Sequence, residues 1–141
     1  MNTYVLDAGA ILRYLENEPG AARVENLLNL ARTGNCEISI SAVNWGEILY
    51  VLLRKFNPAD AATLAKRLRI LPMTICPVGE AEASLAAAFK SQHGIPYADS
   101  FAGGLALATG ATLVTADYDL KACATVIKIE FLPSRSGKST P

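Results

Sequence analysis

Four acidic residues, spread over the whole chain, stand where predicted strands and helices should meet one edge of a sheet. They are Asp7, Glu47, Asp99 and Asp117. The first and last follow short apolar runs, and the other two lie in the first two turns of predicted helices. Sites in open α/β sheets form at the carboxyl ends of the strands. Because four carboxylates gathered there would repel one another, their placement predicts bound divalent cations.

Carboxylates in this arrangement indicate phosphate chemistry. Magnesium and manganese take oxygen ligands, and such ions can activate water and neutralise the leaving oxygen in phosphodiester cleavage. The chain has a single histidine, His93. This count excludes zinc sites built from several histidines and metal-free ribonuclease chemistry that uses two histidines.

Each acid also has a structural interpretation, which the residues alone leave open. Asp7 could cap the helix that follows it, and Asp99 could complement a helix dipole. Glu47 could be an exposed helical residue, although it shares a helix face with Asn44 and has apolar neighbours. Asp117 could be a turn residue. The occurrence of all four at one predicted edge favours the metal site.

Length and composition describe one domain with an ample core. The chain has 141 residues, 51% of them hydrophobic, and a formal net charge of zero, so the strongly basic field of many nucleic-acid binders is absent. Its three cysteines have no metal-ligand spacing, which favours reduced thiols. Neither a signal peptide nor an apolar run long enough to cross a bilayer is present, so we expect a cytoplasmic protein without membrane contact.

Predicted strands alternate with predicted helices along the chain. Strands are expected at 3–6, 36–40, 74–76, 112–115 and 126–129. Helices are expected at 8–15, 21–32, 42–56, 59–71, 79–93 and 97–109, with a helical turn at 119–122. This alternation predicts an α/β fold with a mostly parallel sheet between two layers of helices. The domain is expected to span 1–132, followed by a flexible, Pro/Gly/Ser-rich tail at 133–141 whose basic residues could touch an anionic partner.

The segments around the four acids resemble a known family. The segments are 5–12 (VLDAGAIL), 41–48 (SAVNWGEI), 97–102 (YADSFA) and 113–117 (LVTAD). They are similar to the four signature blocks of PIN domains, in the family's order and spacing, over residues 3–131. The likeness is closest to the small PIN ribonucleases that act as VapC-like toxins of type II toxin–antitoxin pairs.

This resemblance implies a three-layer α/β/α fold with a five-stranded, mostly parallel sheet. It implies a magnesium- or manganese-dependent endoribonuclease with an RNA substrate, a homodimer, and a small antitoxin whose C-terminal segment enters the active-site groove. Four residues match the family's acidic positions, and the resemblance implies a catalytic and metal-binding role for them: Asp7, Glu47, Asp99 and Asp117. Thr115 matches the hydroxyl residue that supports the site.

Two features depart from the usual family pattern. After its first Asp the family often carries Thr or Ser and then Asn or Ser, whereas Ala8 and Gly9 here have no side chain able to form a hydrogen bond. Gly103 and Gly104 fall inside the helix of Asp99, where each costs about 1 kcal/mol relative to Ala. Close backbone packing, at a subunit interface for example, and a locally loosened helix both explain this pair.

Further residues have a functional and a structural interpretation. Arg13 could reach a phosphate or an antitoxin carboxylate, or belong to a solvated helix face. Asp119 could assist Asp117 or cap the following turn. The basic residues of the predicted helix at 59–71, which are Lys66, Arg67 and Arg69, could contact phosphates or be solvated.

The leading hypothesis is therefore a metal-dependent endoribonuclease toxin. The alternative is a catalytically weak PIN-fold binding or partner module. A phosphohydrolase acting on a small phosphate ester ranks below both, because that chemistry usually needs a second acid at the position of Gly9.

Overall fold

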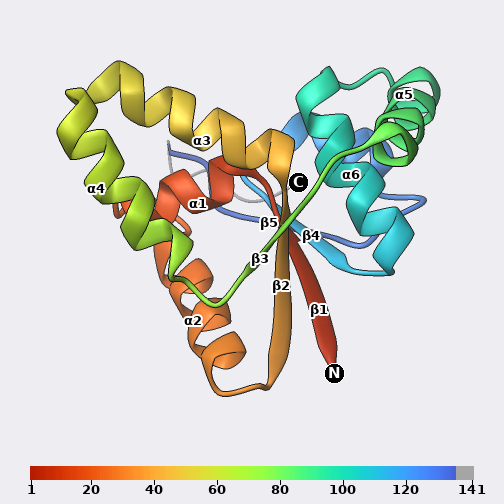
Figure 1. The fold of residues 1–141 in the computed structure, drawn as a ribbon. Coiled ribbons are helices and arrows are strands. Elements are labelled where there is room, and N and C mark those ends of the chain that lie inside the picture. Colours follow the sequence, from red (N-terminus) through yellow and green to blue (C-terminus); the bar gives the residue numbers. More distant parts are fainter. Residues whose placement is uncertain (136–141) are drawn as a thin grey trace.

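The computed structural model describes residues 1–135, which form three layers, with one sheet between two layers of helices (Figure 1). The five strands lie in the order β3-β2-β1-β4-β5, and every neighbouring pair is parallel. Their bounds are β1 (Asn2–Leu6), β2 (Cys36–Ser41), β3 (Thr74–Cys76), β4 (Thr112–Thr115) and β5 (Ile129–Phe131). The predicted three-layer α/β/α fold with a five-stranded parallel sheet is confirmed.

Six α-helices and one 3₁₀ helix connect these strands within the described residues. They are α1 (Ala8–Leu15), α2 (Ala21–Arg32), α3 (Ala42–Lys55), α4 (Pro58–Arg69), α5 (Glu80–His93), α6 (Tyr97–Thr109) and η1 (Tyr118–Cys123). Local signals set their ends. The Ser41 hydroxyl caps α3, and Asn57 caps α4 with Pro58 in its first turn, while Gly94 and Gly110 end α5 and α6 with left-handed backbones.

The sheet separates two hydrophobic cores because consecutive strand residues point to opposite faces. Leu6 and Val114 belong to the core that contains α1, α2 and α3, whereas Val5 and Leu113 belong to the core against α6. In Figure 1, α1 and α2 lie on one side of the strands, and α5 and α6 lie on the other. The central strands β1 and β4 are thereby covered on both faces, as expected for a parallel sheet.

The last strand begins later than the sequence pattern predicts. The sequence pattern predicts a strand at 126–129, but the structure places β5 at Ile129–Phe131. The backbone N–H groups of Val126 and Ile127 both donate to the carbonyl of Cys123, so these residues continue the preceding turn. Pairing with β4, a contact between distant residues, decides where the strand starts.

The glycine pair of α6 packs inside the chain. A Cβ at Gly103 would lie 2.4 Å from Cε1 of Phe89, and one at Gly104 would lie 3.4 Å from Cγ of Leu85, both on α5. Close packing of α6 against α5 therefore accounts for the missing side chains. This favours the close-packing explanation and locates the contact between two helices of the same chain.

Among residues 1–135, no helix combines the length and apolar character needed to cross a membrane. The expected flexible tail at 133–141 falls partly outside the described residues. Within 133–135 the chain contacts the domain, as described below, and the proposed boundary after residue 132 stays a prediction.

Candidate active site

One open pocket of about 430 Å³ lies at the carboxyl ends of β1 and β4, beside the N-terminal parts of α1, α3 and α6. All four predicted acids line it, together with neighbouring backbone and the end of the described chain. The lining residues are Asp7, Ala8, Gly9, Arg13, Glu47, Asp99, Ala116, Asp117, Tyr118, Ser134 and Arg135. The structure thus brings together acids that lie up to 110 positions apart in the sequence.

Asp7 is buried and held by two donors. It follows the last residue of β1 and caps α1, because its Oδ1 accepts the N–H of Ala10 at 2.8 Å. Its Oδ2 accepts the hydroxyl of Thr115, at the end of β4. The capping interpretation is therefore correct and does not compete with a site role, since each carboxylate oxygen keeps a further lone pair. These donors also show how Asp7 is oriented without a polar side chain at position 8 or 9.

Glu47 lies on α3 and faces the pocket, where an amide holds it. Nδ2 of Asn44, one turn earlier, donates to Glu47 Oε1 at 2.8 Å. The same Nδ2 donates to the carbonyl of Ala98 on α6, at 3.2 Å. The sequence placed Asn44 on the face of Glu47, but its contact with α6 appears only in the tertiary structure.

Asp99 and Asp117 interact directly across the pocket. Burial, a hydrogen bond with Asp117 and the negative charges of Asp117, Asp7 and Glu47 together raise the pKa of Asp99 to about 8, with burial as the largest cause. Asp117 caps η1, because its Oδ1 accepts the N–H of Asp119 at 2.9 Å. Without a cation, the pair is thus most stable when it shares a proton.

Asp7 shows the same electrostatic strain. Its pKa is raised to about 6. Burial is the largest cause, the hydrogen bonds from Thr115 and Ala10 act in the opposite direction, and the charges of Asp117 and Glu47 add to the increase. Asp7 and Asp99 therefore both ionise at a higher pH than an ordinary aspartate, and Asp99 does so only above neutral pH. A bound cation would reverse this, since it favours the charged form.

The side chains that could bind a metal in this pocket are of the type that suits a hard divalent cation. Their donor atoms are carboxylate oxygens, which magnesium and manganese prefer, and the raised pKa values of Asp7 and Asp99 show that burial and the neighbouring acids disfavour their charged forms. Within residues 1–135, however, no three His, Cys, Asp or Glu side chains are clustered closely enough to form a metal site. The metal is accordingly part of the proposal below.

Arg13 lies against the pocket but is committed to the backbone. It is buried, and its Nη1 donates to the carbonyls of Pro19 and Pro133, at 2.7 and 2.6 Å. These bonds hold the end of the described chain against the loop between α1 and α2. Arg13 thus contributes to the pocket wall, which differs from the solvated helix face considered above.

Two pocket residues were not singled out by sequence reasoning. Ser134 and Arg135 reach the pocket because the chain after β5 turns back to it, and Arg135 forms an ion pair with Glu18 whose hydrogen bond lowers the pKa of Glu18 to about 2. The basic character of the tail was the only local signal. The side chain of Asp119, in contrast, is exposed and absent from the pocket lining.

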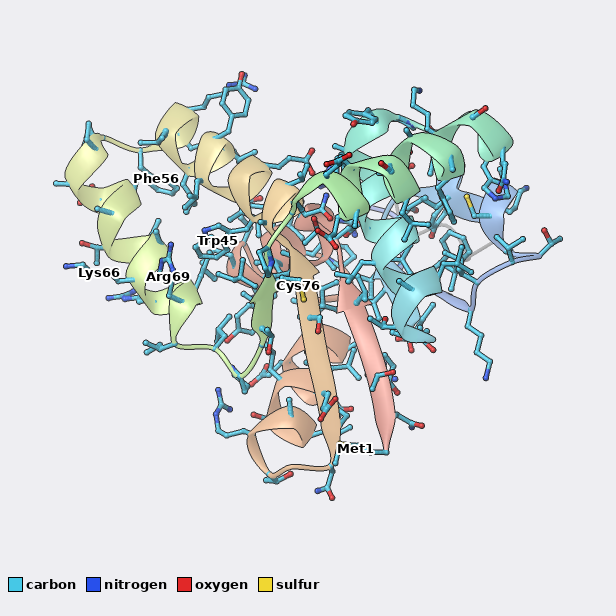
Figure 2. The ribbon with its side chains drawn as sticks, turned by 45° about the vertical axis from the view of Figure 1, so that its right-hand side comes forward. Met1, Trp45, Phe56, Lys66, Arg69 and Cys76 are labelled. Atoms are coloured by element: carbon cyan, nitrogen blue, oxygen red, sulfur yellow. The ribbon has the colours of Figure 1, made fainter. Side chains whose placement is uncertain are left out.

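The basic residues of α4 lie away from this pocket. Figure 2 shows Lys66 and Arg69 on α4, with Arg69 near Trp45 of α3. The guanidinium of Arg69 lies 5.3 Å from the centre of the Trp45 ring, a cation–π contact. Arg69 therefore has a packing role, and a phosphate-contacting role for this surface stays a prediction.

The fold and the pocket together define a three-layer α/β/α domain with acids converging at the carboxyl ends of parallel strands. A comparison with protein families matches the PIN domain over residues 4–126. The chain belongs to the PIN domain family. A search of curated protein sequences finds no significant match.

Solved structures share the fold at low sequence identity. One is VapBC2 from Rickettsia felis bound to a promoter DNA fragment, with a TM-score of 0.73 and 18% identity, covering 92% of this chain and 98% of that chain. DNA-bound VapBC from Salmonella typhimurium has a TM-score of 0.71 and 18% identity, covering 93% of this chain and 98% of that chain. FitAcB from Neisseria gonorrhoeae has a TM-score of 0.65 and 20% identity, covering 89% of this chain and 95% of that chain.

Proposed function

We propose that this protein is a magnesium- or manganese-dependent endoribonuclease that acts as the toxin of a type II toxin–antitoxin pair. The observation that carries the proposal is the convergence of Asp7, Glu47, Asp99 and Asp117 on one pocket in a PIN fold. PIN domains are generally nucleases, and the structures named above include toxin–antitoxin complexes. An antitoxin partner, a homodimer and a cytoplasmic location belong to the same proposal.

The residues take distinct roles in this proposal. Asp7 and Asp99 would hold the ion, and Glu47 and Asp117 would complete its surroundings directly or through water. When bound, magnesium or manganese supplies water activation and charge neutralisation for phosphodiester hydrolysis. Thr115 orients Asp7 and Asn44 orients Glu47, so these carboxylates need little rearrangement.

The openness of the pocket to solvent fits a polymeric substrate. Arg135 lies at its edge with an exposed side chain, where it adds positive charge beside the acids. The other cation in the lining, Arg13, already donates to two backbone carbonyls, and the remaining charged residues there are acids. The zero net charge of the chain implies that such local charges, rather than a whole-protein field, bind the RNA.

Cleavage of single-stranded RNA in Mn²⁺ and in EDTA tests the proposal. We expect cleavage in the metal only, and a loss of more than about 100-fold in Asp99→Asn, since even residues that only support a metal site cost 10–100-fold. Asp7→Asn should do the same while staying folded, because Asn is also a good helix cap. Undiminished cleavage by either variant, with unchanged circular dichroism, would remove the mechanism.

The alternative is a PIN-fold partner module with weak catalysis. Its support is the pair Ala8 and Gly9, which offers no side-chain ligand or donor next to Asp7. Expression in bacteria separates the two functions. A toxin should arrest growth, with relief by Asp99→Asn or by a co-expressed antitoxin, whereas a partner module should leave growth unchanged.

A further inference from the structure

Asn44 is a fully buried polar residue at the junction of two helices that carry acids. It lies in the first turn of α3, with 0% of its surface exposed. Its Nδ2 donates to Oε1 of Glu47, at 2.8 Å, and to the carbonyl of Ala98, at 3.2 Å. Because both partners are acceptors, the orientation of the amide is determined: the nitrogen faces them and Oδ1 points away.

The two partners belong to different parts of the acid pocket. Glu47 is one of its four carboxylates, and Ala98 immediately precedes Asp99 in the first turn of α6. The two hydrogen atoms of one amide thus connect the carboxylate of Glu47 to the backbone beside Asp99. This connection sets the spacing between two acids that come from separate helices.

The arrangement has a cost in stability. Within residues 1–135, Oδ1 of Asn44 is buried without a hydrogen-bond partner. An unpaired buried acceptor lowers stability, and an apolar side chain of similar size would avoid this cost. Stability alone therefore does not explain an amide at this position, whereas the two bonds made by its nitrogen do.

An amide is also the suitable donor next to a metal-binding carboxylate. It is neutral, so it orients Glu47 without offering a competing positive charge, as Lys or Arg would. It uses one of about four lone-pair positions on the carboxylate and leaves the others for an ion or water. Supporting partners of this kind commonly change metal affinity by 10–100-fold.

We propose that Asn44 is a positioning residue that fixes Glu47 relative to the first turn of α6 and so prepares the pocket for a divalent ion. This inference rests on the proposed metal-dependent function, and it concerns a residue that does not itself bind the ion. The two hydrogen bonds of Asn44 join α3 to α6 at the pocket. Replacing Asn44 should therefore weaken ion binding by changing the position of Glu47.

A double-mutant cycle measured by calorimetric Mn²⁺ binding tests this coupling. Asn44→Ala should weaken Mn²⁺ binding by about 10–100-fold in the otherwise unchanged protein. In a Glu47→Ala background the same change should weaken it by less than about threefold, because the group that Asn44 positions is gone. Asn44→Ser, which keeps one donor, is the milder variant if Asn44→Ala does not fold.

A stability control separates positioning from simple destabilisation. Ile48→Val shortens another buried residue of α3 and should lower the melting temperature in EDTA while leaving Mn²⁺ affinity unchanged. Equal losses of affinity from Asn44→Ala in both backgrounds, or none in either, would overturn the inference. A protein that neither binds Mn²⁺ nor cleaves RNA before any mutation would instead overturn the proposed function.

Discussion

Thr115, the last residue of β4, donates its hydroxyl hydrogen to Oδ2 of Asp7, which follows the neighbouring strand β1 and lies 108 positions earlier in the chain. The same hydroxyl oxygen accepts the N–H of Asp117 at 2.9 Å. One side chain thus orients two of the pocket acids. It also opposes the effect of burial on the pKa of Asp7.

Replacing this hydroxyl should weaken the pocket at both acids. Thr115→Val keeps the shape but leaves Asp7 Oδ2 without its donor and the Asp117 N–H without its acceptor. We expect a stability loss of about 1–3 kcal/mol and Mn²⁺ binding weaker by about 10–100-fold. Thr115→Ser keeps the hydroxyl and should restore most of the affinity. Calorimetry and thermal unfolding check both changes, and equal Mn²⁺ affinities for the two variants would contradict the assigned role.

The metal-free protein should lose stability as pH rises from 5 to 8. The folded-state pKa values of Asp7 and Asp99, about 6 and about 8, exceed the ordinary value of 3.8. The folded state therefore binds more protons at these two groups than the unfolded state, so their contribution to stability is full below pH 4 and declines as pH rises through both values. The lowered pKa of Glu18 acts below this window.

Thermal unfolding in EDTA at several pH values measures this decline. Asp7 alone accounts for at most about 3 kcal/mol, at about 1.4 kcal/mol per pKa unit. Asp99→Asn should flatten the upper part of the curve, and Mn²⁺ should raise the melting temperature most at pH 8, where the carboxylates are ionised. A melting temperature that rises between pH 5 and 8 in EDTA would contradict the assigned electrostatics.

A methyl group at Gly103 should destabilise the fold despite favouring a helix. Alanine gains about 1 kcal/mol of helix propensity, but its Cβ would lie 2.4 Å from Phe89 and force α5 and α6 apart. Overpacking costs of about 1–3 kcal/mol should outweigh the gain. Gly46→Ala on α3 is the matched control, because its added Cβ has no neighbour within 4 Å beyond the adjacent residues and the backbone of its own helix, and it should raise the melting temperature.

Arg13→Met should separate the two roles considered for Arg13. It keeps much of the apolar stem but removes the donors to the carbonyls of Pro19 and Pro133. A wall-forming role predicts a stability loss of about 2–3 kcal/mol and faster proteolysis after residue 132. RNA affinity in EDTA measures the other role: a lower dependence of binding on salt in this variant would show a phosphate contact instead.

Arg135→Gln should weaken RNA binding without changing metal affinity. Its exposed guanidinium lies at the pocket, paired with Glu18. If it contacts a phosphate, its loss should reduce the slope of log affinity against log salt by about 1, measured by fluorescence anisotropy in EDTA. Arg32→Gln, at the end of α2, removes the same charge outside the pocket and should leave the slope unchanged.

The helices at 8–15, 21–32 and 97–109 could be predicted to the residue, because their limits depend on local features such as the glycine that ends the third. The acids at the strand ends could likewise be placed at one edge, since parallel strands direct their carboxyl ends together. Three features could not be predicted from the sequence: the start of β5, the two hydrogen bonds that Asn44 donates, and the return of Arg135 to the pocket. Each depends on contacts between residues distant in the chain, which no local pattern contains and only the packed structure determines.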